Sequence, residues 1–192
     1  MIFQKLKPFA LVGALVASPI FAADYVIDTQ GAHASINFKI NHLGVSYVTG
    51  RFNEFSGTYS YDSDRPEDTK LEVVINTASV DSNHAERDRH IRSSDFFDVR
   101  QYSDARFVST SYEDLGDGKG VMSGQLTFLG QTQPVAIQVE KVGEGQDPWG
   151  GYRTGFVGTA ELNLPDFGAN FNLGPAAEKV YLDLVIEAFA SK

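Results

Sequence analysis

The residues best suited to chemistry are histidines, two of which lie among charged side chains between residues 83 and 92. Four histidines are present in the 192-residue sequence: His33, His42, His84 and His90. An imidazole beside carboxylates can bind a metal or transfer a proton near neutral pH. In a helix, Glu86 and His90 would share a face, but His84 and His90 are six residues apart and would not. The spacing therefore favours a solvated helix with ion pairs, such as Glu86 with Arg89, over a metal site.

Motifs for other common chemistries are absent from the sequence. No Gly-x-Ser-x-Gly nucleophile turn is present, and no glycine-rich motif for a nucleotide cofactor or a phosphate. The absence of cysteine removes disulfides, thiolate metal sites and a cysteine nucleophile. We therefore assign no catalytic residue, no metal and no cofactor. A metal-dependent or other enzyme that uses the segment from His84 to His90 remains the alternative.

The composition indicates one acidic globular domain. The chain has 25 acidic and 16 basic residues, a formal charge of −9, and 42% hydrophobic residues. That apolar content can fill one core at this length. Since phosphate backbones are bound by basic surfaces, the charge argues against a nucleic-acid partner.

The first 22 residues have the pattern of a secretory signal peptide. Lys5 and Lys7 precede a short apolar run, Pro19 interrupts it, and Ala22 and Ala23 offer small side chains for cleavage. We predict a signal peptide at 1–22, cleavage after Ala22 and a mature periplasmic domain at 23–192. Removing two lysines and no acid takes the charge from −9 to −11.

The elements that must position any site are predicted to be antiparallel strands. From residue 34 onward, polar and apolar residues alternate between turns rich in Gly, Asn, Asp and Pro. Expected strands are Tyr25–Ile27, His33–Ile40, Thr49–Tyr61, Lys70–Asn76, Arg106–Glu113, Lys119–Leu129, Gln133–Val142, Tyr152–Asn163 and Lys179–Phe189. We expect sequential neighbours to pair. About eight such strands can close into a barrel whose interior holds packed side chains or one ligand.

One segment breaks the alternation and predicts a short helix. Asn83 followed three residues later by Glu86 is typical of a capping box, and Arg89 and Arg92 suit a helix C-terminus. The fold class is therefore all-β, an antiparallel barrel with one short helix.

The chain after residue 22 resembles the YceI family, secreted bacterial proteins with a lipocalin-like barrel. The resemblance is carried by several stretches together: His33-Ala34, His42-Leu43-Gly44, Gly50-Arg51-Phe52, Phe55-Ser56-Gly57, Asn83-His84-Ala85-Glu86-Arg87-Asp88, Asp95-Phe96-Phe97, Gly124-Gln125-Leu126-Thr127, Pro134-Val135, Asp147-Pro148-Trp149-Gly150-Gly151 and Leu173-Gly174-Pro175-Ala176. It implies a periplasmic protein that binds an isoprenoid lipid, such as an isoprenoid quinone or a polyprenyl carrier, in an elongated apolar cavity. Lipid carriage, storage or sensing would be its role, and no catalytic residue is implied.

The resemblance and the strand phases together give the expected site. Lining residues would be Phe38, Ile40, Phe52, Phe55, Leu126, Phe128, Ile137, Phe156, Leu182 and Leu184. A polar head group at the mouth would meet His84, Arg87, Arg89, His90 or Trp149. Expected partners are the lipid and, transiently, a membrane, with the protein a monomer or a homodimer. An outer-membrane β-barrel is a competing interpretation of the strands and the signal peptide.

Overall fold

The computed structural model describes residues 23–169, 171 and 173–191, so the predicted signal peptide lies outside the described part of the chain. In that part, no helix has the length and apolarity to cross a membrane. The strands are β1 (Ala23–Ile27), β2 (Ser35–His42), β3 (Ser46–Phe52), β4 (Phe55–Tyr61), β5 (Lys70–Asn76), β6 (Val80–Asp81), β7 (Asp104–Gly116), β8 (Lys119–Phe128), β9 (Gln131–Gln146), β10 (Tyr152–Asn163) and β11 (Lys179–Ala190). The helices are α1 (Ala85–Arg92) and the 3-10 turns η1 (Pro66–Asp68), η2 (Thr77–Ser79), η3 (Leu164–Phe167) and η4 (Pro175–Ala177).

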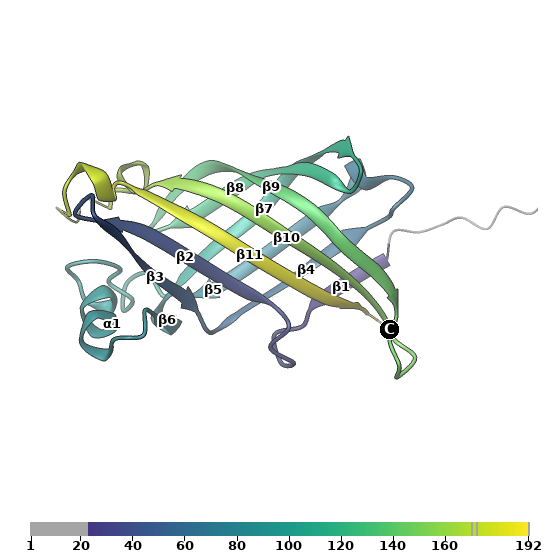
Figure 1. Cartoon of the computed structure of the whole chain (residues 1–192), viewed down its shortest axis with the longest axis horizontal. Helices are drawn as coiled ribbons and strands as arrows, with labels where there is room; N and C mark the ends of the chain where they lie inside the picture. Colours follow the sequence, from purple (N-terminus) through teal and green to yellow (C-terminus); the bar gives the residue numbers. More distant parts are fainter. Residues whose placement is uncertain (1–22, 170, 172, 192) are drawn as a thin grey trace, which may run out of the picture.

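Eight of these strands form a closed antiparallel barrel. Around the ring they run β1, β4, β5, β7, β8, β9, β10 and β11, and β1 closes it by pairing with both β4 and β11. The predicted barrel is therefore confirmed. Figure 1 shows the strands crossing the long axis obliquely, as closure of a barrel requires.

The predicted strand Thr49–Tyr61 is wrong, because it is two strands in different parts of the sheet. β3 pairs with β2, whereas β4 pairs with β1 and β5. Between them, the backbone N–H of Asn53 donates to Ser79, and the carbonyl of Glu54 accepts from Asn76, so the chain leaves one strand partner and joins another. Sequential pairing also fails at this break and between β1 and β2.

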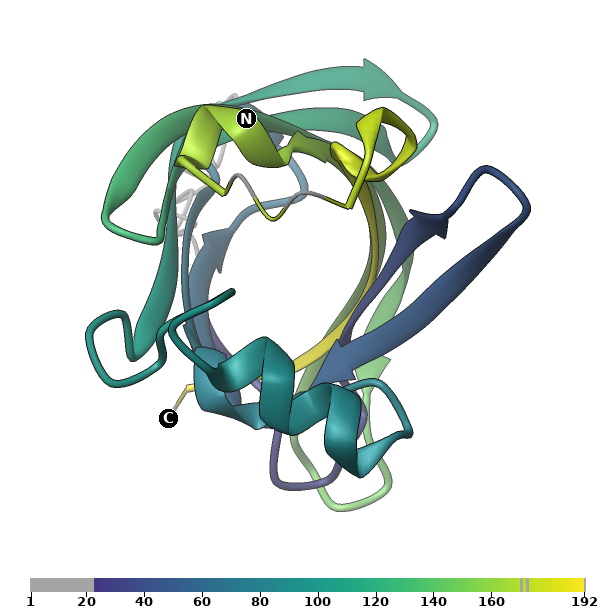
Figure 2. The same cartoon turned by 90° about the vertical axis from the view of Figure 1, so that its left-hand side faces the viewer.

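The remaining strands form a branch from the ring. β2 pairs with the first half of β11, and β1 pairs with its last residues, so both lie on the same side of that strand. β3 continues the branch and meets the short β6 through Arg51 and Phe52. Figure 2 shows the β2–β3 hairpin diverging from the ring.

The predicted helix is confirmed as α1, but its N-cap is His84 and not Asn83. His84 accepts a hydrogen bond on its ring Nδ1 from the backbone N–H of Arg87, while Asn83 has a left-handed backbone with φ of 61°. At the other end, the Arg92 guanidinium donates to the carbonyls of Ala78 and Val80. These bonds hold α1 across one end of the barrel (Figure 2).

Candidate ligand-binding site

The interior of the barrel contains two apolar cavities that share wall residues. The mouth cavity, beside α1, measures about 520 Å³, and the deep cavity, farther along the axis, measures about 140 Å³. Four side chains line both: Ile36, Ile75, Leu126 and Leu182. The two cavities therefore lie next to each other along the barrel, and we call the pair the slot.

The mouth cavity is walled by strands on one side and by a cap of helix and loops on the other. Ile91 of α1 and Phe96 and Phe97 of the following turn line it, as do Phe171 and Leu173 from the loop before η4. The Phe97 ring lies edge-on to Phe128, with centroids 5.2 Å apart. Polar groups enter at the rim through Asn41, His42, Arg87 and His90.

The deep cavity is lined mostly by aliphatic and aromatic side chains, among them three tyrosines, Tyr59, Tyr61 and Tyr112. The Tyr59 ring stacks on Tyr25 at 5.1 Å, and its hydroxyl is hydrogen-bonded to the Thr154 hydroxyl. Burial raises the pKa of Tyr59, so this hydroxyl stays neutral. The deep part of the slot thus carries no charge on its wall near neutral pH.

An ion-pair cluster sits where the barrel ring closes, at the end far from α1. Arg153 Nη1 lies 2.7 Å from both Asp28 Oδ2 and Glu187 Oε1, and Arg153 Nε lies 3.1 Å from Asp147 Oδ2. The Arg153 bonds, aided by the backbone N–H of Gly31, lower the pKa of Asp28 to about 2. The cluster joins β10, β11 and the turn after β1.

The same place holds the one group of three side chains, among the described residues, whose ligand atoms are close enough for a metal: Asp28, His33 and Glu187. The Arg153 guanidinium already supplies the positive charge to both carboxylates, so the group fits an ion-pair network better than a cation site.

The histidines of the segment from His84 to His90 take part in helix capping, an ion pair and a ring contact. His84 caps its helix through Nδ1, and His90 Nε2 lies 3.4 Å from Asp95 Oδ2 with its ring against Phe96. Glu86 forms the predicted ion pair with Arg89. In the part of the chain that the structure describes, neither histidine belongs to a group with metal-ligand geometry.

Nine of the ten expected lining residues lie on the walls of the slot. Those in the mouth cavity are Phe38, Ile40, Phe52 and Phe128, those in the deep cavity are Ile137, Phe156 and Leu184, and Leu126 and Leu182 line both. Phe55 is the exception, because it packs against the core around Tyr25 and Ile27. Strand phase and the family resemblance together predict these nine positions, and their contact with a ligand stays a prediction.

The five expected head-group residues do not form one cluster. Arg87 and His90 line the mouth cavity, whereas His84 caps α1 and Arg89 is turned to Glu86 in solvent. Placing Trp149 at the mouth is wrong, because it lies in the turn between β9 and β10, at the opposite end of the barrel (Figure 1). Sequence adjacency could not reveal that α1 and this turn lie at opposite ends.

Residues of the cap were missed by the sequence analysis. Phe97, Ile91 and Phe171 come from the helix and from loops, where strand phase gives no information. The adjacent aromatic pair Phe96-Phe97 was the one available signal, since two neighbouring phenylalanines in a loop need a cavity or a core to cover them.

Comparison with known proteins agrees with this geometry. The YceI-like domain matches residues 25–188. The chain belongs to the YceI family. UPF0312 proteins of Shewanella sp. strain MR-4 and Shewanella oneidensis are each 57% identical over 180 residues, covering 93% of this chain and 94% of theirs.

Solved structures of other proteins share the fold. The Campylobacter jejuni YceI protein superposes with a TM-score of 0.72 at 25% identity, covering 97% of this chain and 100% of its own. A polyisoprenoid binding domain from Saccharophagus degradans gives a TM-score of 0.62 at 18% identity, covering 88% of this chain and 99% of its own.

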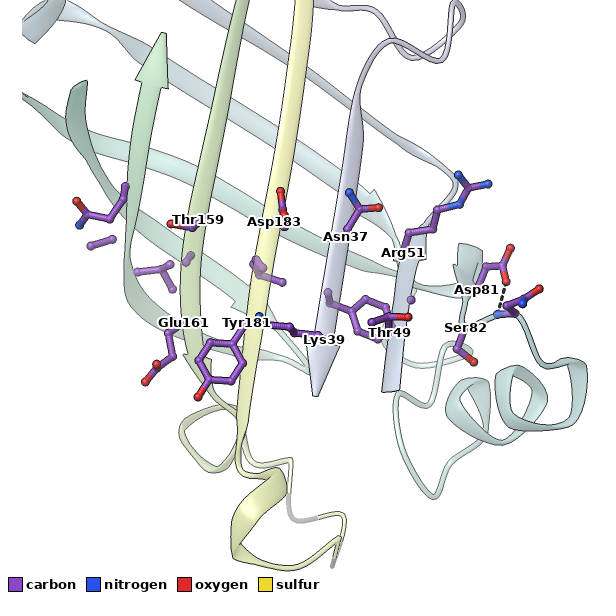
Figure 3. A pocket seen from close by; sticks show the side chains of 18 of the residues that line it. Asn37, Lys39, Thr49, Arg51, Asp81, Ser82, Thr159, Glu161, Tyr181 and Asp183 are labelled. Carbon is purple, nitrogen blue, oxygen red and sulfur yellow. Dashed lines mark hydrogen bonds between the residues drawn. The ribbon is translucent and has the colours of Figure 1, made fainter. Parts of the chain in front are cut away.

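This YceI-family barrel also has an open groove on its outer surface, of about 1050 Å³. Figure 3 shows Asn37, Lys39 and Asp183 along it, on neighbouring strands. Glu161 and Arg51 add further charge to its lining. An apolar chain would gain little there, so the smaller interior slot is the better lipid site.

Proposed function

We propose that the protein binds one isoprenoid lipid, with its chain in the slot and its head group at the mouth beside α1. The observation that carries this proposal is the adjacency of two apolar cavities inside the barrel, which share the wall residues Ile36, Ile75, Leu126 and Leu182. A long, narrow and apolar space fits an extended hydrocarbon chain better than a compact solute. The polyisoprenoid named for the Saccharophagus degradans domain supports the same ligand class.

The slot can bind such a chain through burial alone. Removing apolar surface from water contributes about 25 cal/mol per Å², so a prenyl chain enclosed along its length needs no polar anchor in the deep cavity. Association and ordering of the flexible chain offset part of this gain. Selectivity would then depend on the length and width of the slot.

The mouth provides a place for a polar head group. Arg87 donates from Nε to the hydroxyl of Ser82, at 2.7 Å, and from Nη2 to its carbonyl, at 2.6 Å. These bonds hold the guanidinium at the rim of the mouth cavity, where His90 also lies. A quinone carbonyl or a phosphate would find hydrogen-bond donors there.

A carrier, store or sensor of this lipid in the periplasm is the role that follows. The signal-peptide pattern of residues 1–22 supports export. Binding requires no catalytic residue, metal or further cofactor.

The test is mass spectrometry of organic-solvent extracts from protein purified from the periplasm. Leu182→Trp places a large ring where the two cavities meet, and Asp183→Trp places the same ring on the outward face of the same strand. We expect a stoichiometric prenyl lipid on the wild type and on Asp183→Trp, and none on a folded Leu182→Trp. Empty extracts, together with no binding of added isoprenoid quinones or prenyl phosphates, would refute the proposal.

A further inference from the structure

The tip of the β2–β3 hairpin exposes two large apolar side chains. Leu43 is 72% exposed and Val45 is 81% exposed. Leu43 also has a left-handed backbone, with φ of 57°, which is costly for a bulky residue. The fold therefore gains little from either side chain, and it holds Leu43 in solvent at a cost.

This tip is part of the rim of the slot. Leu43 lines the mouth cavity, and so does Leu173 from the loop before η4, which is 43% exposed. The same side chains thus face the cavity and the solvent. An apolar chain that lies between Leu43 and Leu173 would therefore reach from the slot to any surface that covers the rim.

The hairpin and the loop before η4 lack the acidic residues that are common in the rest of the chain. No Asp or Glu occurs between Asp28 and Glu54, although the whole chain has 25 acidic residues. That stretch carries Lys39 and Arg51, and residues 167–177 of the facing loop carry no charged side chain. An anionic lipid surface would repel most of the exterior of an acidic protein, but not the hairpin and this loop, although α1 at the same end carries the exposed carboxylates of Glu86 and Asp95.

We propose that the mouth docks on a phospholipid bilayer, with Leu43 and Val45 inserted at the boundary between head groups and acyl chains. Tyr47, half exposed beside them and within 5.4 Å of the Lys39 ammonium, suits the head-group level, where tyrosine and lysine are both favoured. This inference rests on the proposed function, because the bilayer would be the source from which the slot takes its lipid. A bilayer at the rim lets a prenyl chain enter without crossing water.

Vesicle co-sedimentation tests the docking, using purified mature protein and large unilamellar vesicles of phosphatidylcholine and phosphatidylglycerol. Val45→Asp puts a charge at the tip without altering a residue that lines the slot, and Val45→Leu keeps the tip apolar. Trp149→Asp is the matched control, since Trp149 is 83% exposed at the opposite end of the barrel. Val45 and Trp149 are both exposed, so all three variants are expected to fold.

We expect Val45→Asp to weaken vesicle binding by about tenfold or more, and Val45→Leu and Trp149→Asp to bind as the wild type does. Loss of binding in Trp149→Asp but not in Val45→Asp would overturn the proposal, as would a wild type that does not bind vesicles. Tip-dependent dimerisation without vesicle binding would assign the tip to a second copy of this chain and would also overturn it.

Lipid uptake from detergent micelles separates this inference from the proposed function. A Val45→Asp variant that loads a prenyl quinone from micelles like the wild type, but slowly from vesicles, supports both. A wild type that loads from micelles but never binds vesicles refutes docking alone. Vesicle binding that depends on Val45, without any uptake, refutes the lipid-binding function alone.

Discussion

Two leucines have the same unusual backbone conformation, but one side chain is buried and the other is exposed. Leu43 and Leu129 both have positive φ, 57° and 50°, each at the turn of a hairpin. Leu129 is buried in the core around Phe128 and Phe167, where its side chain compensates for the strained backbone. Leu43 has no such compensation, which is the reason to look for its value in an interaction with another surface.

This difference predicts that a glycine substitution at the two positions has opposite effects on the free energy of unfolding. Leu43→Gly should leave the free energy of unfolding unchanged or raise it by up to about 1 kcal/mol, because glycine adopts positive φ without strain. Leu129→Gly should lower it by about 2 to 4 kcal/mol, because the loss of a buried side chain outweighs the relief. Urea unfolding followed by circular dichroism measures both, and equal destabilisation by the two variants would contradict the argument.

The Arg153 cluster predicts a pH dependence of stability. Arg153 lowers the pKa of Asp28 from 3.8 to about 2, so the folded protein favours the ionised carboxylate. This contribution is present above the unfolded pKa and is lost as the pH falls from about 4 towards 2, at up to about 2 kcal/mol. Urea unfolding at pH values from 2.5 to about 7 should show a flatter curve for Asp28→Asn than for the wild type over that acidic window. Parallel curves would exclude a role for this carboxylate.

At the residue scale, strand phase predicted most of the slot and little of its ends. Ile40, Leu126 and Ile137 were found because alternation assigns a side to every residue of a strand. Phe171 and Trp149 could not be placed, since a loop has no period and its end of the barrel depends on the topology.

At the scale of elements, polar contacts to one buried serine anchor α1 in addition to the Arg92 bonds at its C-terminal end. Asp88 Oδ1 accepts from both the backbone N–H and the hydroxyl of Ser82, and the Arg87 guanidinium donates to the hydroxyl and carbonyl of the same residue. The helix thereby fixes Arg87 at the rim of the mouth cavity, and the following turn brings in the Phe97 ring.

Removing the Asp88 carboxylate should therefore loosen the cap. Asp88→Ala leaves the buried N–H of Ser82 without its acceptor, at a cost of about 1 to 3 kcal/mol. Glu86→Ala, on the exposed face of the same helix, should cost less than about 1 kcal/mol. Hydrogen exchange at residues 82–97 measures the loosening, and equal exchange in the two variants would show that Ser82 does not anchor the helix.

Among the elements, the sequence predicts hairpins with a clear turn better than a break within a run of strand-forming residues. The hairpin β8–β9 was predicted because turn residues around Gly130 lie between two alternating segments, and in the structure Leu129 and Gly130 have the positive φ of such a turn. The break between β3 and β4 was missed, although the inward rings of Phe52 and Phe55 are three residues apart and cannot share one face of a continuous strand. That change of phase was the available signal.

For the whole molecule, closure of the ring decides what the strands enclose. Alternation predicts an apolar interior for a filled barrel and for a hollow one alike, so the slot could be inferred from the sequence only through the family resemblance. The structure shows how the slot is oriented: the larger cavity lies beside α1, and the Arg153 cluster joins the strands at the other end of the barrel.

If the lipid enters beside α1, the affinity of the slot should depend on the length of the prenyl chain. Ile137→Trp fills the deep cavity but leaves the mouth cavity free, whereas Leu182→Trp obstructs the junction of both. We expect Ile137→Trp to lower affinity for long prenyl chains and to spare short ones, because a short chain stops before the deep cavity. Leu182→Trp should lower affinity for all but the shortest. Competition binding with isoprenoid quinones of increasing chain length measures this, and an equal loss at every length for Ile137→Trp would show that the two cavities do not act as one graded slot.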